Sequence, residues 1–221
     1  SYFYTKRGPR TIKVKGAYNM RDIGGIRTSS GKVVRQCLVY RSGNFDKIKE
    51  KGKDRIRELG IRTQLDVRKD GEGKVGQQTL PVENFIHIRA HSYFRMWRTK
   101  KRIKRTISIM KLFADENNYP IVYHCVYGRD RTGTITFLLY GLLGVEKRDI
   151  YRDYELTFIS RHSGSSAKEK MENMDDFYDQ ISSYKDSTKS LRYNVRAFLT
   201  DNGMTEEELQ NIERILLSDR R

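Results

Sequence analysis

The chain has 221 residues and a net charge of +16, with 44 lysines and arginines against 28 aspartates and glutamates. It is long enough for one sizeable hydrophobic core, and its two cysteines are too few for a disulfide framework. It lacks the roughly 20 consecutive apolar residues of a membrane span, and its start lacks the apolar region of a signal peptide. We expect a soluble protein, either cytoplasmic or exported with its signal removed.

The predicted elements alternate between strands and helices before a run of helices. We expect residues 1–15 to be a basic, loosely ordered lead-in and residues 16–221 to form a single domain. In chain order, the patterns predict a strand over 33–40, a helix face at Ile48, Ile56 and Leu59, strands over 61–67 and 85–89, a helix over 103–113, a strand over 121–125 and helices over 131–143, 148–160, 168–184 and 188–201. This order predicts an α/β fold with a central, mostly parallel sheet flanked by helices and a helical C-terminal half.

The last helix has a specific start signal. Thr205 is followed three residues later by Glu208, the pattern of a capping box, and Met204 with Leu209 can form a hydrophobic staple. We therefore expect a helix to begin directly after Thr205.

The segment HCVYGRDRTG, residues 124–133, carries the predicted chemistry. A buried strand would deliver Cys125 to the edge of a sheet, and the following loop and helix N-terminus would direct backbone N–H groups at an anion. Gly128 lets the loop turn, and Arg131 offers a planar fork that matches two phosphate oxygens. Such surroundings favour the thiolate form of a cysteine. Cys125 is therefore the predicted nucleophile and Arg131 the phosphate clamp.

The neighbours of Cys125 have predicted supporting roles. His124 would hold the loop through hydrogen bonds, and the Thr132 hydroxyl would bond the sulfur when it leaves. The predicted phosphate-binding loop comprises Val126, Tyr127, Gly128, Arg129, Asp130 and Arg131. The alternative is a buried structural cysteine beside a surface arginine, which the strand, the loop glycine and the Arg-Thr-Gly sequence disfavour.

These residues resemble the signature HCxxGxxR[ST]G of the protein tyrosine phosphatase superfamily, and most of all its bacterial branch with tyrosine, dual or lipid specificity, whose loop reads HCxxGKDRTG. Further segments similar to that branch are residues 19–25, 40–43, 64–72 and 142–157. The resemblance implies a cysteine phosphatase fold that hydrolyses phosphate monoesters through a phosphocysteine intermediate, with no metal or other cofactor. Its implied substrates are phosphotyrosine, phosphoserine or phosphothreonine, and phosphoinositides. Arg129 replaces the lysine of the branch, which bears on substrate preference.

The general acid has two candidates. Many enzymes of the superfamily use an aspartate from a loop upstream of the cysteine, but residues 89–105 contain no Asp or Glu. Asp130 lies in the loop itself, where the branch also has aspartate, and Asp66 ends a predicted strand. Either carboxylate could instead be structural, Asp130 bonded to backbone N–H groups and Asp66 paired with Arg68 or Arg41.

A basic stretch should overhang the site. Its charged residues are Arg95, Arg98, Lys100, Lys101, Arg102, Lys104 and Arg105, with Trp97 among them. The candidates for recognising a polyanionic substrate are Arg95, Arg98, Lys100 and Lys101. That substrate would be a phosphoinositide, an inositol phosphate or an acidic phosphoprotein, with contact to acidic headgroups also open. The alternative is the solvated face of a helix. Trp97 could either stack on a substrate ring or anchor the helix.

Other residues are assigned structural roles. We expect Arg21, Asp22 and Arg41 to brace the loop through salt bridges, and Cys37 to be a buried strand residue. Three functions then compete: a phosphatase, a catalytically weak module that binds phosphorylated ligands, and a nucleic-acid binder that only the net charge supports. The loop motif favours the phosphatase.

Overall fold

The central sheet has five strands in the order β1-β3-β6-β4-β5. The structure, a computed structural model, describes residues 10–160 and 167–219. The strands are β1 (Arg21–Asp22), β3 (Val39–Ser42), β4 (Thr63–Asp66), β5 (Asn84–His87) and β6 (Ile121–His124). β3, β6, β4 and β5 run parallel, and β1 pairs antiparallel with β3. The prediction of a mostly parallel sheet in an α/β fold is confirmed.

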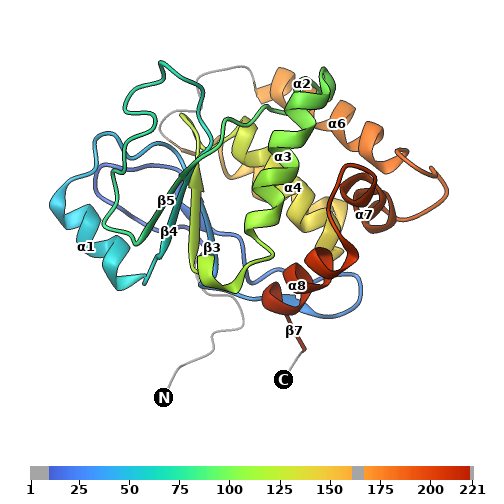
Figure 1. Cartoon of the computed structure of the whole chain (residues 1–221), viewed down its shortest axis with the longest axis horizontal. Coiled ribbons are helices and arrows are strands. Elements are labelled where there is room, and N and C mark those ends of the chain that lie inside the picture. Colours follow the sequence, from blue (N-terminus) through green and yellow to red (C-terminus); the bar gives the residue numbers. More distant parts are fainter. Residues whose placement is uncertain (1–9, 161–166, 220–221) are drawn as a thin grey trace.

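Helices cover both faces of this sheet, as Figure 1 shows, with α1 on one face and the others on the opposite face. The helices are α1 (Glu50–Glu58), α2 (Phe94–Trp97), α3 (Lys100–Leu112), α4 (Asp130–Leu143), α5 (Lys147–Glu155), α6 (Ala167–Ser182), α7 (Leu191–Asp201) and α8 (Glu206–Leu216), with a 3-10 turn, η1 (Glu116–Asn118). The predicted capping box of α8 is present, with Thr205 and Glu208 bonded reciprocally. Within the described residues, no helix combines the length and apolar character needed to cross a bilayer.

The hydrophobic core lies on the two faces of the sheet. α4 is apolar around its whole circumference and is buried from Thr132 to Leu143, between the sheet and the C-terminal helices. A smaller cluster under α1 includes Val14, Phe45 and Ile56. Residues 10–15, which belong to the predicted lead-in, thus contribute Val14 to this cluster, whereas residues 1–9 lie outside the described part of the chain.

The predicted strand over residues 33–40 is divided in two. β2 (Val33–Val34) pairs with β7 (Leu217–Ser218) in a separate small sheet, and β3 begins only at Val39. Cys37 lies in the turn between them with φ 64° and an exposed side chain, so the prediction of a buried strand residue is wrong. The Asp22 carboxylate fixes this turn, because it accepts the Cys37 N–H at 2.7 Å and the Gly24 N–H at 2.7 Å.

The parallel strands end at the same level, which positions the site. Ser42, His124 and Asp66 are aligned in register across β3, β6 and β4. The segments that follow these strands therefore meet at one edge of the sheet, as expected for the carboxyl ends of parallel strands.

Candidate active site

The signature loop, residues 125–131, connects β6 to α4 at this edge. Cys125 is free and buried, the Gly128 N–H donates to its Sγ at 3.2 Å, and Thr132 Oγ1 lies 4.0 Å from the sulfur. Gly128 has φ +65°, and a Cβ atom there would lie 2.5 Å from the backbone of Ser42 and Gly43. The loop can therefore close over the sulfur only with glycine at this position.

Glu72 binds the arginine of the loop. Arg131 Nη1 donates to Glu72 Oε2 at 2.6 Å, and Nη2 approaches Oε1 at 3.3 Å. Burial acts to lower the pKa of Arg131, but the Cys125 and Glu72 charges raise it overall. Glu72 is the last residue of the family-like segment over residues 64–72, but no role was predicted for it. An acidic residue at the end of that segment is the signal that could have identified it.

A cavity of about 310 Å³ opens beside the loop. It is lined by Asn44, Asp46, Arg68, Glu72, Gly73, Val126, Tyr127 and Arg131. The Tyr127 side chain is 46% exposed, and the Arg129 guanidinium lies 5.8 Å from the centre of its ring. The cavity therefore combines the guanidinium of Arg131 with an aromatic ring.

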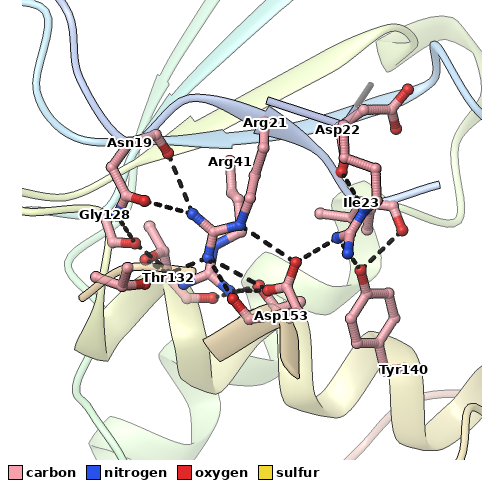
Figure 2. A network of polar contacts seen from close by, with 12 residues as sticks. Asn19, Arg21, Asp22, Ile23, Arg41, Gly128, Thr132, Tyr140 and Asp153 are labelled. Atoms are coloured by element: carbon pink, nitrogen blue, oxygen red, sulfur yellow. Dashed lines mark hydrogen bonds and ion pairs between the residues drawn. The ribbon is translucent and has the colours of Figure 1, made fainter. Parts of the chain in front are cut away.

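A buried ionic network holds the loop from behind (Figure 2). Arg41 donates through Nη2 to the carbonyl oxygens of Gly128 at 3.0 Å and Arg129 at 3.2 Å, and through Nη1 to Asp153 Oδ2 at 2.6 Å. Arg21 also binds Asp153. Arg41 therefore braces the loop as predicted, but through hydrogen bonds to its carbonyl groups, while its salt bridge is with Asp153. Asp22 instead fixes the turn near Cys37.

Asp153 is the common acceptor of this network. It is fully buried and binds three guanidinium groups, those of Arg10, Arg21 and Arg41. Burial acts to raise the pKa of Asp153, but the three arginines outweigh it and lower the pKa well below its ordinary value. Sequence reasoning gave Asp153 no role, although it lies in the family-like segment over residues 142–157.

The two candidate acids have different surroundings. Asp130 is the first residue of α4, accepts from the Tyr154 hydroxyl at 3.2 Å, and keeps 26% of its side chain exposed. Asp66 is fully buried, and its two oxygens bind Arg68 Nε at 3.0 and 3.1 Å. Burial acts to raise the pKa of Asp66, but Arg68 and His124 lower it overall. The geometry thus matches the structural alternative for Asp66 and leaves Asp130 open to solvent.

His124 lies one residue before the nucleophile and contacts the neighbouring strand. Its Nε2 atom is 3.0 Å from Gln64 Nε2 on β4, and its ring meets Phe45 edge-on at 5.0 Å between centres. Burial lowers the pKa of His124 to about 4, which keeps the ring neutral near pH 7. These contacts hold β6 in place directly below the loop.

The basic stretch divides into outer and inner residues. Arg95, Arg98, Lys100 and Lys101 are exposed, and none of them lines the cavity beside the loop. Burial, together with the charges of Arg102, Arg89, Arg105 and Arg131, lowers the pKa of His91 to about 4. The inner residues Arg102 and Arg105 are thus electrostatically coupled to the same histidine as the loop arginine.

Trp97 anchors the basic stretch to the helical half of the molecule. Its ring stacks on Tyr184 at 5.8 Å between centres and packs against Phe198 at 4.7 Å. Of the two interpretations of Trp97, the structure therefore supports the anchor rather than a ring that stacks on substrate.

Comparison with known proteins identifies the family to which this fold and loop belong. Residues 12–218 match the model of the tyrosine phosphatase family. The chain therefore belongs to this family of phosphatase enzymes.

Individual relatives are more distant. A Cupriavidus necator protein named as a candidate tyrosine-protein phosphatase is 26% identical over 62% of this chain, and the match spans only 59% of that protein's length. TpbA of P. aeruginosa has 15% identity and a TM-score of 0.46, covering 76% of this chain and 89% of its own. The catalytic core of the PP-IP phosphatase SIW14 of S. cerevisiae has 16% identity and a TM-score of 0.43, covering 66% and 83%.

Proposed function

We propose that the protein hydrolyses phosphate monoesters through a phosphocysteine intermediate on Cys125. The observation that carries this proposal is the buried thiol at the base of the loop, with a backbone N–H on its sulfur and Arg131 held by Glu72 beside it. The backbone N–H groups of such a loop stabilise a thiolate and then a phosphoryl group. Arg131 binds two phosphoryl oxygens with its planar fork, and Glu72 keeps the guanidinium oriented.

In the first step, the Cys125 sulfur attacks phosphorus. An S–P bond forms as the P–O bond to the leaving group breaks, and Asp130 transfers its proton to the departing oxygen. In the second step, water attacks phosphorus and gives its proton to the Asp130 carboxylate. The S–P bond then breaks, inorganic phosphate is released, and the Thr132 hydroxyl, 4.0 Å from the sulfur, stabilises the departing thiolate.

The preferred substrate in this proposal is an aryl phosphate, such as phosphotyrosine, on an acidic partner. The exposed ring of Tyr127 on the cavity supports an aromatic leaving group, since aromatic rings stack favourably. Arg89, Arg102 and Arg105 around His91 support additional negative charge, as in an acidic phosphopeptide or a phosphoinositide headgroup. A panel of phosphotyrosine, phosphoserine and phosphatidylinositol phosphate substrates ranks these possibilities.

Trapping the covalent intermediate tests the mechanism. Acid quenching during turnover of an activated aryl phosphate should leave one phosphoryl group on the peptide that contains Cys125, as detected by mass spectrometry. Cys125→Ser should reduce turnover by more than about a hundredfold and keep vanadate binding. A variant that retains more of its activity would show that the nucleophile is wrong. A wild-type protein that binds vanadate but does not turn over would instead be a binding module for phosphorylated ligands.

A further inference from the structure

Two consecutive residues of α5 reach the signature loop from different directions. Asp153 binds Arg41, which donates to the loop carbonyls, and the Tyr154 hydroxyl donates to Asp130 Oδ1 at 3.2 Å. Neighbouring residues of an α-helix point about 100° apart, so one short helix supports both the base of the loop and its first helical residue. Because Asp153 is tied to buried arginines, α5 is a fixed platform for Tyr154.

Tyr154 is a permanent hydrogen-bond donor to Asp130. Its side chain is buried, and burial followed by the nearby Asp130 charge raises the pKa of Tyr154, so the hydroxyl stays protonated at working pH. The hydroxyl occupies Oδ1 of the carboxylate. The Arg129 Nε atom lies 3.3 Å from both Oδ1 and Oδ2, so Oδ1 accepts from two donors and Oδ2 from this one alone among the described residues. The second lone pair of Oδ2 can therefore carry the transferred proton.

Packing prevents Tyr154 from moving away. Its ring meets the Tyr93 ring edge-on, with centres 5.9 Å apart. A Cβ atom at Gly133 would lie 2.6 Å from Tyr93 Oη and 3.2 Å from Tyr154 Cε2. The glycine of the Arg-Thr-Gly sequence therefore makes room for both rings against the first turn of α4. This close packing gives the hydroxyl of Tyr154 a defined position relative to Asp130.

We propose that Tyr154 is a positioning residue that orients the Asp130 carboxyl for proton transfer to the leaving group and from water. This inference rests on the proposed function, in which Asp130 is the general acid and base. A fixed donor on one oxygen removes the rotational freedom of the carboxyl group and directs the other oxygen toward the reacting atoms. The role differs from that of Asp153, which supports the loop but does not contact the proton-transfer group.

The test is Tyr154→Phe, which removes the hydroxyl and keeps the packed ring. We expect kcat/KM for phosphotyrosine to fall about tenfold, equivalent to ~1.4 kcal/mol, and kcat/KM for an activated aryl phosphate to change less than about twofold, because kcat/KM reports only the steps up to formation of the phosphocysteine. The basic limb of the kcat/KM profile should move to higher pH, because the lost donor stabilised the ionised carboxylate. Tyr151→Phe is the matched control on the same helix, since its hydroxyl donates at 2.6 Å to Asp175, away from the loop.

The double variant separates positioning from general stability. Tyr154→Phe added to Asp130→Asn should cause no further slowing, because its effect acts through Asp130. Equal losses on both substrates, or a further loss in the double variant, would overturn the inference and leave Tyr154 with a packing role. If Asp130→Asn itself shows no dependence on the leaving group, the acid assignment and this inference both fail. Trapping of the Cys125 intermediate would still decide the rest of the proposed function.

Discussion

Arginines near the signature loop and basic residues over 95–105 have similar side chains in opposite surroundings. Arg21, Arg41 and Arg68 are almost completely buried, and each binds a carboxylate. Arg95 and Arg98, in contrast, lie at the surface. The buried set determines the shape of the site, whereas the exposed set contributes to the field around it. The basic residues behind the net charge of +16 therefore have two separate roles, one in the structure of the site and one in the electrostatic field around it.

The two regions should also differ in the energy of each ion pair. Removing one partner of a buried pair costs about 3–5 kcal/mol, because the other charge stays buried without compensation. An exposed pair contributes only about 0–1 kcal/mol, since water and salt screen both charges. Substitutions that change charge without changing size can measure this difference directly.

The largest effect is expected for Asp153→Asn. The substitution removes the shared negative charge from the guanidinium groups of Arg21 and Arg41, which remain buried. We expect the free energy of unfolding to fall by about 3–5 kcal/mol in urea titrations. Asp149→Asn on the same helix is the control, because its partners Arg148 and Arg152 are largely exposed. Similar losses in both variants would remove the proposed difference between the two regions.

Local sequence signals predicted most of the fold and the centre of the site. Each of three predicted features depends on a short continuous stretch of sequence: the strand before Cys125, the loop glycine and the capping box at Thr205. The structure contains all three. Asp153 could not be predicted in this way, because its partner Arg41 lies 112 residues away. Only folding brings the two together, and an acidic residue on a polar helix carries no local mark of burial.

The prediction that Cys37 is a buried strand residue was wrong for a related reason. The run over 33–40 has the β-branched composition of one strand, but the Asp22 carboxylate, 15 residues earlier, binds the Cys37 N–H and fixes a turn. A long-range hydrogen bond therefore overrode local propensity. Glu72 and Tyr154 were missed in the same way, since their roles depend on contacts with Arg131 and Asp130.

An effect of intermediate size is expected for the dependence of stability on pH. Its source is the buried His124 ring, which is neutral in the folded protein near pH 7. Burial lowers the pKa of His124 to about 4, below the value of about 6.5 of an exposed histidine. Between these two pH values, His124 is protonated in the unfolded chain but not in the folded protein. The free energy of unfolding is therefore highest above about pH 6.5 and decreases as pH falls toward 4. We expect the wild type to lose about 1–3 kcal/mol over this range in unfolding titrations.

Two variants identify the source of this pH dependence. His124→Gln should flatten the slope of unfolding free energy against pH, whatever its effect on the absolute stability. His91→Gln should change the slope less, because His91 is partly exposed and solvent screens its charge. An unchanged slope in His124→Gln would mean that other groups bind the protons and that His124 titrates as an exposed residue does.

The smallest effect is expected for the basic stretch over residues 95–105. It tests whether the location of a charge within this stretch affects KM, or only the total charge does. Arg102 and Arg105 act on the same histidine as Arg131, whereas Lys100 and Lys101 are exposed at the start of α3. Arg102→Gln with Arg105→Gln should raise KM for a phosphatidylinositol bisphosphate about three- to fivefold at low salt, within the ~1 kcal/mol range of exposed charges. Lys100→Gln with Lys101→Gln removes the same charge and should raise KM less than about twofold.

The salt dependence and a small substrate complete this last test. The increases in KM of both double variants over the wild type should become smaller at about 1 M salt, where the screening length is about 3 Å. Hydrolysis of an activated aryl phosphate should stay unchanged in both double variants, since this substrate carries no second anionic group. Equal increases in KM for the two pairs would mean that the basic stretch acts through its total charge, so that its inner and outer residues would not differ in function. A larger effect of the inner pair would instead extend the site from Arg131 to the first turns of α3.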